Sequence, residues 1–220
     1  MFSWDEILIL GDSFAGHRTE ETDWPQQLAM KLTNESFDPN RLPRGQGFIG
    51  CALWSVRLRL YEEFKQSTRP KLAVFCHTDA SRLPSNTNVP LNVNSSLFTA
   101  NSVKTITKEV NDYLKISEAC QQYYDHLYCE DFHTWAQAQW FTELDKHLRI
   151  FNVQTVHLHL TQVHNFNWGM TVQQPLHDLT IPRDWAGHNH FSIENNLKFA
   201  NELYKVIENY TNSTQIRLNW

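Results

Sequence analysis

The 220-residue chain has little cysteine, no long hydrophobic run and no excess of basic residues. Its four cysteines are too few and too scattered for a disulfide framework in a chain of this length, so we expect buried free thiols. The formal net charge of −5 gives no general attraction to phosphate backbones or to anionic lipid. We therefore expect neither nucleic acid nor a membrane surface among its partners.

The first ten residues, MFSWDEILIL, carry two acidic residues, no basic segment, and an apolar run too short for a signal peptide or a membrane span. This pattern predicts a cytoplasmic protein, or one packaged with a viral particle that assembles in the cytoplasm. The sequence also has no HExxH or CxxC pattern. Although His157 and His159 share one face of a predicted strand, we expect no metal and no cofactor.

Three short apolar runs have the near-continuous hydrophobicity of strands buried on both faces of a parallel sheet, at residues 6–10, 71–76 and 155–160. Helical spacing of apolar residues predicts helices between and after them, over 53–64, 101–128, 138–148 and 193–207. Asp23 and Ser192 are the expected N-caps of two helices.

Because strands and helices alternate, the sequence predicts an α/β fold, a three-layer α/β/α sandwich around a parallel sheet. No internal repeat or long linker divides the chain, so we expect one domain over residues 1–210 and a polar tail over 211–220. Two long loops are expected, near residues 83–100 and 161–189.

The first predicted strand ends in Gly11, Asp12 and Ser13, and the helix-forming segment WPQQLA follows. Reactive groups in parallel sheets gather beyond the carboxyl ends of the strands. Ser13 can serve either as a cap that satisfies turn amides or as a nucleophile. Asp23 and Pro25 already begin the next helix ten residues later, which favours the nucleophile.

In this arrangement the chain resembles the GDSL, or SGNH, hydrolase family of esterases and deacetylases, with Gly11, Asp12 and Ser13 on the nucleophile block. The resemblance implies a flavodoxin-like fold with Ser13 as the nucleophile. A second family block supplies an oxyanion-hole amide from a glycine before a helix. In GQGFIGCALWSVRLRL this residue corresponds to Gly50, with Gly47 as the alternative.

The third family block, Gly-X-Asn-Asp, falls on Cys76, His77, Thr78 and Asp79, so Thr78 replaces the asparagine that donates to the oxyanion. A hydroxyl can still donate one hydrogen bond, whereas the loss of a good oxyanion donor costs about 3 kcal/mol in the barrier. His77 is a second candidate donor to the oxyanion or to the substrate. Its structural alternative is a histidine bonded to loop carbonyls.

The fourth block, Asp-X-X-His, lies before the last helix, in RDWAGHNHFSIENN. Since the family histidine precedes the helix cap by two residues, the cap at Ser192 selects His190 as the general base, with His188 as the alternative. Gly187 then occupies the position of the usual aspartate. Either Asp184 orients His190 from further along the loop, or Ser13 and His190 act as a dyad, with a backbone carbonyl or the neighbouring asparagine holding the imidazole.

The resemblance implies a serine ester hydrolase. Its expected substrate is a small-molecule or carbohydrate ester, because Trp54, Trp168 and Trp185 lie near the predicted active edge and aromatic faces stack on sugar rings. Two alternatives remain open. The first is a non-catalytic binding or structural module of the same fold, such as a component of a viral particle. The second is an acyltransferase on the same scaffold.

Overall fold

The structure, a computed structural model, describes residues 1–15, 21–45, 47–48, 53–82, 108–179, 191–211 and 214–220. Its centre is a six-stranded sheet in the order β2-β1-β3-β4-β5-β6, in which every pairing is parallel. The strands are β1 (Ile7–Asp12), β2 (Gly47–Phe48), β3 (Leu72–His77), β4 (Gln154–His159), β5 (Met170–Val172) and β6 (Thr214–Ile216). The first five follow the order of a doubly wound, flavodoxin-like sheet.

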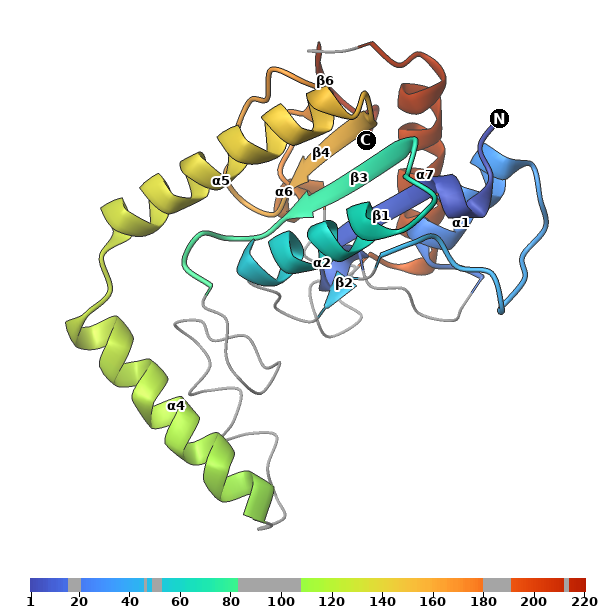
Figure 1. The fold of residues 1–220 in the computed structure, drawn as a ribbon. Coiled ribbons are helices and arrows are strands. Elements are labelled where there is room, and N and C mark those ends of the chain that lie inside the picture. The colour runs from blue at the N-terminus through green and yellow to red at the C-terminus, as the bar shows by residue number, and fades with distance from the viewer. Residues whose placement is uncertain (16–20, 46, 49–52, 83–107, 180–190, 212–213) are drawn as a thin grey trace.

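Helices cover both faces of this sheet (Figure 1). They are α1 (Trp24–Thr33), α2 (Leu53–Lys65), α4 (Lys108–His126), α5 (Glu130–Ile150), α6 (Leu176–Leu179) and α7 (Ile193–Glu208), and short 3-10 helices lie at Trp4–Glu6 and Ser13–Ala15. The α1 and α7 helices pack on one face, and α2 and α5 pack on the other. The fold is therefore a parallel α/β sheet flanked by helices, compatible with three layers.

Alternating side chains of the central strands form two separate cores. On the α1 and α7 face, Val74 of β3 and Val156 of β4 pack with Phe199 and Leu203 of α7. On the α2 and α5 face, Phe75 of β3 belongs to a cluster that includes residues of both helices. Strands buried on both faces must be apolar along their whole length, which explains why β1, β3 and β4 could be predicted.

Several elements differ from the sequence-based expectation. The segment 161–189, expected to be one long loop, contains β5 and α6. The expected tail is also part of the domain, because β6 pairs with β5 and Leu218 is buried in the core. Among the cysteines, Cys76 and Cys120 are buried as expected, but Cys129 is exposed.

The ends of the two helices on the first face meet each other. Ser192 caps α7 as predicted, and its hydroxyl accepts a hydrogen bond from the Asn195 amide at 3.2 Å. Asp23 occupies the N-cap position of α1, but its side chain makes no capping hydrogen bond. Instead, Asn196 of α7 accepts a hydrogen bond from the Trp24 amide at 3.3 Å, which ties the starts of α1 and α7 together.

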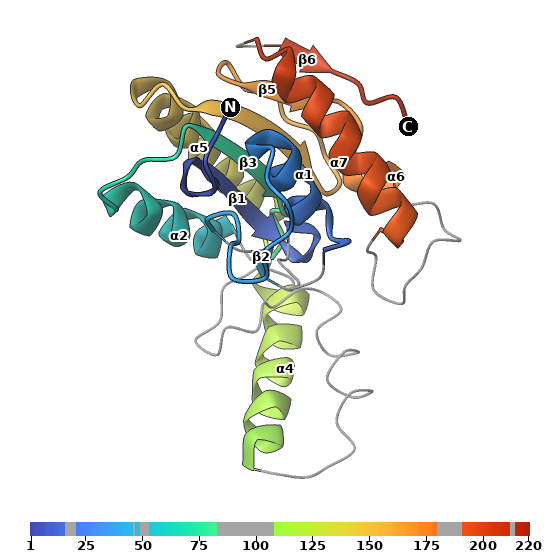
Figure 2. The same cartoon turned by 90° about the vertical axis from the view of Figure 1, so that its right-hand side faces the viewer.

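The α4 helix extends away from the body of the molecule on the side of the sheet where β1 and β3 end (Figures 1 and 2). It covers the described part of the helix predicted over residues 101–128. Among the residues that the structure describes, no helix has both the length and the apolar character needed to cross a membrane.

Candidate functional site

The Gly-Asp-Ser segment lies where β1 ends at the edge of the sheet. Asp12 is the last residue of β1, and Ser13 begins the 3-10 helix Ser13–Ala15. A Cβ atom at Gly11 would stand 2.5 Å from both the Cβ and the carbonyl oxygen of Cys76 in β3. Only glycine therefore allows β1 and β3 to approach this closely just before Ser13.

Asp12 holds the turn that follows it. Its carboxylate accepts a hydrogen bond from the Phe14 amide at 3.0 Å and forms an ion pair with Arg82 at 3.2 Å. The side chain is buried, and burial raises the pKa of this carboxyl although the Arg82 charge opposes the change. Its oxygens thus serve to fix the backbone around Ser13.

The residues expected at the oxyanion hole are placed only in part. Gly50 lies outside the described residues. Its alternative, Gly47, starts β2 and pairs with Gly11, so it lies beside the Gly-Asp-Ser segment at the same edge. Thr78 directly follows β3 and is 2% exposed, and its hydroxyl has no hydrogen-bond partner among the described residues. An unpartnered buried hydroxyl is free to donate to a developing oxyanion.

His77 does not suit the donor role considered for it. Its Nε2 lies 2.9 Å from Nδ1 of His157, and Nε2 of His157 lies 3.1 Å from the carbonyl oxygen of Trp168. Because that carbonyl can only accept, His157 carries its proton on Nε2 and receives the His77 proton at Nδ1.

Burial lowers the pKa of both imidazoles well below the usual value, so they are neutral. His77 therefore donates to His157 and presents a bare Nδ1, which can only accept. The loop-carbonyl alternative is not what the structure shows either, because the partner of His77 is another imidazole.

His157 and His159 of β4 belong to a larger aromatic cluster. The His157 ring lies parallel to Phe166 with centroids 3.5 Å apart, and the His159 ring centroid is 5.8 Å from that of His164. Burial lowers the pKa of His159 to about 3. Among the described residues, no group of three or more His, Cys, Asp or Glu side chains is arranged to hold a metal ion.

The expected general base lies outside the described residues, as do His188, Gly187 and Asp184. The residue that follows His190 is placed, however. The ring of Phe191 meets that of Phe14 edge-on, with centroids 5.7 Å apart, and both side chains are buried. Phe14 is the residue after Ser13, so the chain positions next to Ser13 and next to His190 are in direct contact.

His177 is a residue at this edge that the sequence reasoning missed. It lies in α6 with an exposed side chain, and its amide donates to the carbonyl of Leu160, just beyond β4, at 3.2 Å. His177 also acts electrostatically on the Asp12 carboxyl, in the direction that lowers the pKa of that group. The only sequence signal was a histidine within the segment 161–189, which was expected to be a loop.

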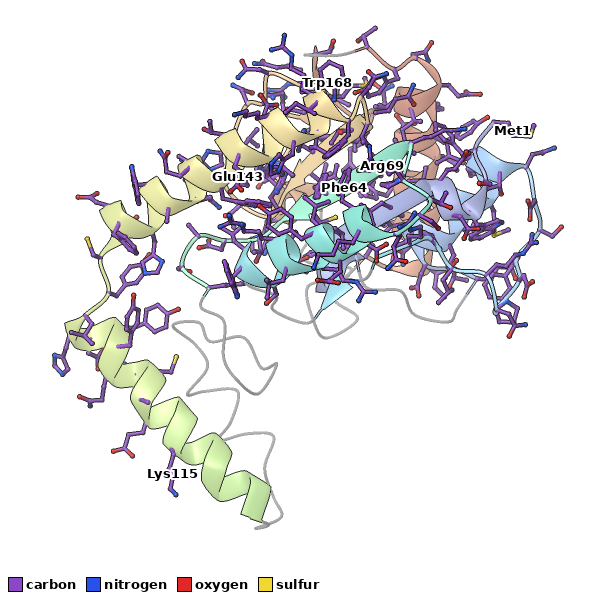
Figure 3. All side chains as sticks on the ribbon, in the orientation of Figure 1. Met1, Phe64, Arg69, Lys115, Glu143 and Trp168 are labelled. Atoms are coloured by element: carbon purple, nitrogen blue, oxygen red, sulfur yellow. The ribbon has the colours of Figure 1, made fainter. Side chains whose placement is uncertain are left out.

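The tryptophans give less support for sugar stacking than expected. Trp168 lies toward the opposite edge, because its indole donates to the carbonyl of Val153 at 2.7 Å, one residue before β4 begins (Figure 3). Trp185 is outside the described residues. Trp54 is 49% exposed near the start of α2, with the Arg57 guanidinium 5.6 Å from its ring centroid.

Comparisons with protein-family models, with curated proteins and with solved structures gave no match to this chain.

Proposed function

We propose that the protein is a serine ester hydrolase in which Ser13 is the nucleophile and His190 is its general base. The contact between Phe14 and Phe191 carries this proposal, because each ring belongs to the residue directly after one of the proposed catalytic residues. Since both rings are buried, this contact is a fixed part of the core. It holds the residue after Ser13 against the residue after His190.

Further contacts restrain the same two segments. The Phe14 carbonyl accepts a hydrogen bond from the Trp24 indole at 2.5 Å, and the Trp24 ring meets Phe199 of α7 edge-on at 5.2 Å. Phe199 in turn packs on Phe191 at 4.8 Å. Catalysis by a hydroxyl and an imidazole requires both groups to be held in reach of each other, and a shared aromatic core supplies such support.

In the proposed reaction, the Ser13 hydroxyl attacks the ester carbonyl while His190 takes its proton. Negative charge develops on the carbonyl oxygen and is stabilised by the Ser13 and Gly50 amides and by the Thr78 hydroxyl. When the tetrahedral intermediate collapses, the alcohol leaves with the proton held by His190. Water, activated by the same histidine, then attacks the acyl-Ser13 ester and releases the acid. Asp184 is the proposed third member of the unit.

Hydrolysis of p-nitrophenyl acetate tests this proposal directly. We expect Ser13→Ala to remove activity above the uncatalysed rate, and His190→Ala to lower kcat by roughly 10³-fold or more. The matched controls are Ser67→Ala, at an exposed serine before β3, and His188→Ala, two residues from the proposed base. Both should retain most of the activity.

Four results would change the assignment. A Ser13→Ala protein as active as the wild type would overturn the nucleophile and leave a non-catalytic module as the better account. If His188→Ala or His177→Ala loses more activity than His190→Ala, the base is misassigned. Product formation that appears only with an added alcohol acceptor would identify an acyltransferase. An Asp184→Asn variant with unchanged kcat would show a Ser-His dyad.

A further inference from the structure

A polar cavity of about 110 Å³ lies beside the carboxyl ends of β3 and β4. Its walls come from the residues that end and follow β3, the first turns of α5 and the residues after β4. The last pair between β1 and β3 is Gly11 with Cys76, and Ser13 and Thr78 each follow this pair by two positions. Because β1 and β3 are neighbouring strands, the cavity lies at the same end of the sheet as the proposed nucleophile.

Hydrogen-bond acceptors and negative charge dominate the described wall of this cavity. Asp79 and Glu130 contribute carboxylates, and no lysine or arginine is among the described residues that line it. Burial acts to raise the pKa of Asp79, but hydrogen bonds from Ser81 and the nearby Arg82 charge outweigh it, so the pKa is lowered and the group is ionised. An anion entering this space would meet like charge.

The side chains at the end of β3 also favour a ligand that donates hydrogen bonds. His77 and Thr78 line the cavity, and His77 Nδ1 is a bare acceptor because its other nitrogen donates to His157. On the α5 side, Gln137 is fixed by a hydrogen bond from its amide nitrogen to the Thr78 carbonyl at 3.2 Å. One of its two N–H groups is thereby used, and the amide oxygen can accept a hydrogen bond.

We propose that this cavity selects the alcohol portion of the ester, taking a neutral or cationic group that donates hydrogen bonds, such as a hydroxyl or an ammonium, and rejecting a carboxylate. The inference rests on the proposed function for the identity of the reacting ester. The cavity volume equals about four water molecules at roughly 30 Å³ each, so it admits a polar substituent of a few heavy atoms.

Three probes that differ only at carbon 6 test the selection: the 3-O-acetyl esters of methyl glucoside, methyl 6-amino-6-deoxyglucoside and methyl glucuronide. They present a hydroxyl, an ammonium and a carboxylate on the same ring. We expect the wild-type protein to hydrolyse the first two with kcat/KM at least about 10-fold above that of the glucuronide, because like charges repel in the cavity. Binding of the three unacetylated glycosides, measured by saturation-transfer NMR, should follow the same order.

A charge reversal at the rim separates this proposal from a general effect of the negative protein. Glu130 lines the cavity, whereas the adjacent Asp131 in the same exposed first turn of α5 does not. We expect Glu130→Lys to raise kcat/KM for the glucuronide and to lower it for the 6-amino-6-deoxyglucoside, so that their ratio changes by about 10-fold. Asp131→Lys has the same net charge and should keep the wild-type order, together with the wild-type rate on p-nitrophenyl acetate.

The outcomes distinguish this inference from the proposed function. One outcome is that p-nitrophenyl acetate is hydrolysed through Ser13, but the kcat/KM values of the three glycoside esters rank in the same order in the wild type, Glu130→Lys and Asp131→Lys. In that case the cavity does not select the substrate. If no ester is hydrolysed but the free glycosides bind in the expected order and respond to Glu130→Lys alone, the cavity is a binding site and the hydrolase proposal fails.

Discussion

The two faces of the central strands differ sharply at the edge where the candidate site lies. On the α1 and α7 face, β3 and β4 present Cys76 and Leu158, which lie in a core of aliphatic and aromatic side chains. On the opposite face, the neighbouring positions of the same strands are His77, His157 and His159. The first face fixes the segments around Ser13 by apolar packing, whereas the second depends on the protonation state of its imidazoles.

Truncation of one buried phenylalanine on each face tests this contrast with the largest expected effect. Phe199→Ala should lower the free energy of unfolding by about 3–5 kcal/mol, because Phe199 is fully buried against Trp24 and Phe191. Phe166→Ala should also destabilise the fold, because it removes the ring stacked on His157. Urea unfolding at several pH values measures both.

The pH dependence separates the two variants. Water that replaces Phe166 can hydrate the imidazolium form, so the deficit of Phe166→Ala relative to the wild type should shrink between pH 7 and pH 5. The deficit of Phe199→Ala should stay constant. If the unfolding free energies of the two variants change with pH in parallel, the α2 and α5 face is not the part of the core that responds to protons.

Thr78 stands at the edge of the sheet, beyond the last residue of β3, and Thr78→Val separates catalysis from stability. Its hydroxyl has no partner among the described residues, so removing it should leave the free energy of unfolding nearly unchanged. As an oxyanion donor, however, it should be worth a factor of about 10² in kcat. Steady-state kinetics beside thermal unfolding gives both values; a stability loss without a kcat loss would make Thr78 purely structural.

The acid sensitivity of the second face predicts a smaller, graded effect. Burial lowers the pKa of His159 to about 3, below the value of about 6.5 for an unfolded histidine. As the pH falls from about 6.5, the unfolded chain therefore takes up this proton while the folded chain does not. The free energy of unfolding therefore has its full value above about pH 6.5. It decreases as the pH falls below that value, by about 1.4 kcal/mol per pH unit for each such histidine.

We expect a His159→Phe variant to have a smaller slope of unfolding free energy against pH between about pH 6.5 and pH 4. The reduction should equal the contribution of one histidine, about 1.4 kcal/mol per pH unit. The exposed His126 provides the control, and His126→Gln should keep the wild-type slope. An unchanged slope in His159→Phe would show that His159 does not contribute to acid unfolding.

Sequence reasoning predicted the parts of the fold that are determined by local composition. The β1, β3 and β4 strands are continuous apolar runs, and Ser192 caps α7 with its own side chain. By contrast, β5 and β6 are three residues long and are defined by their pairing with neighbouring strands. No periodicity is visible in so short a segment, so the residues near Thr214 were interpreted as a tail.

For the candidate site, a local sequence signal exists only in the short Gly-Asp-Ser motif. Gly11 and Ser13 were identified from the turn that they form, and the contact with Cys76 explains the need for glycine. The role of His77 depends on a nitrogen of His157, 80 positions away, and the charge of the cavity depends on α5 meeting the end of β3. Such long-range pairings have no local sequence signal.

Labelling with a fluorophosphonate probe, followed by peptide mapping, tests the central claim most directly. We predict one adduct on Ser13 in the wild-type protein, no adduct in Ser13→Ala, and strongly slowed labelling in His190→Ala. A wild-type protein that is not labelled, or one labelled at a residue other than Ser13, would contradict the assignment of Ser13 as an activated nucleophile.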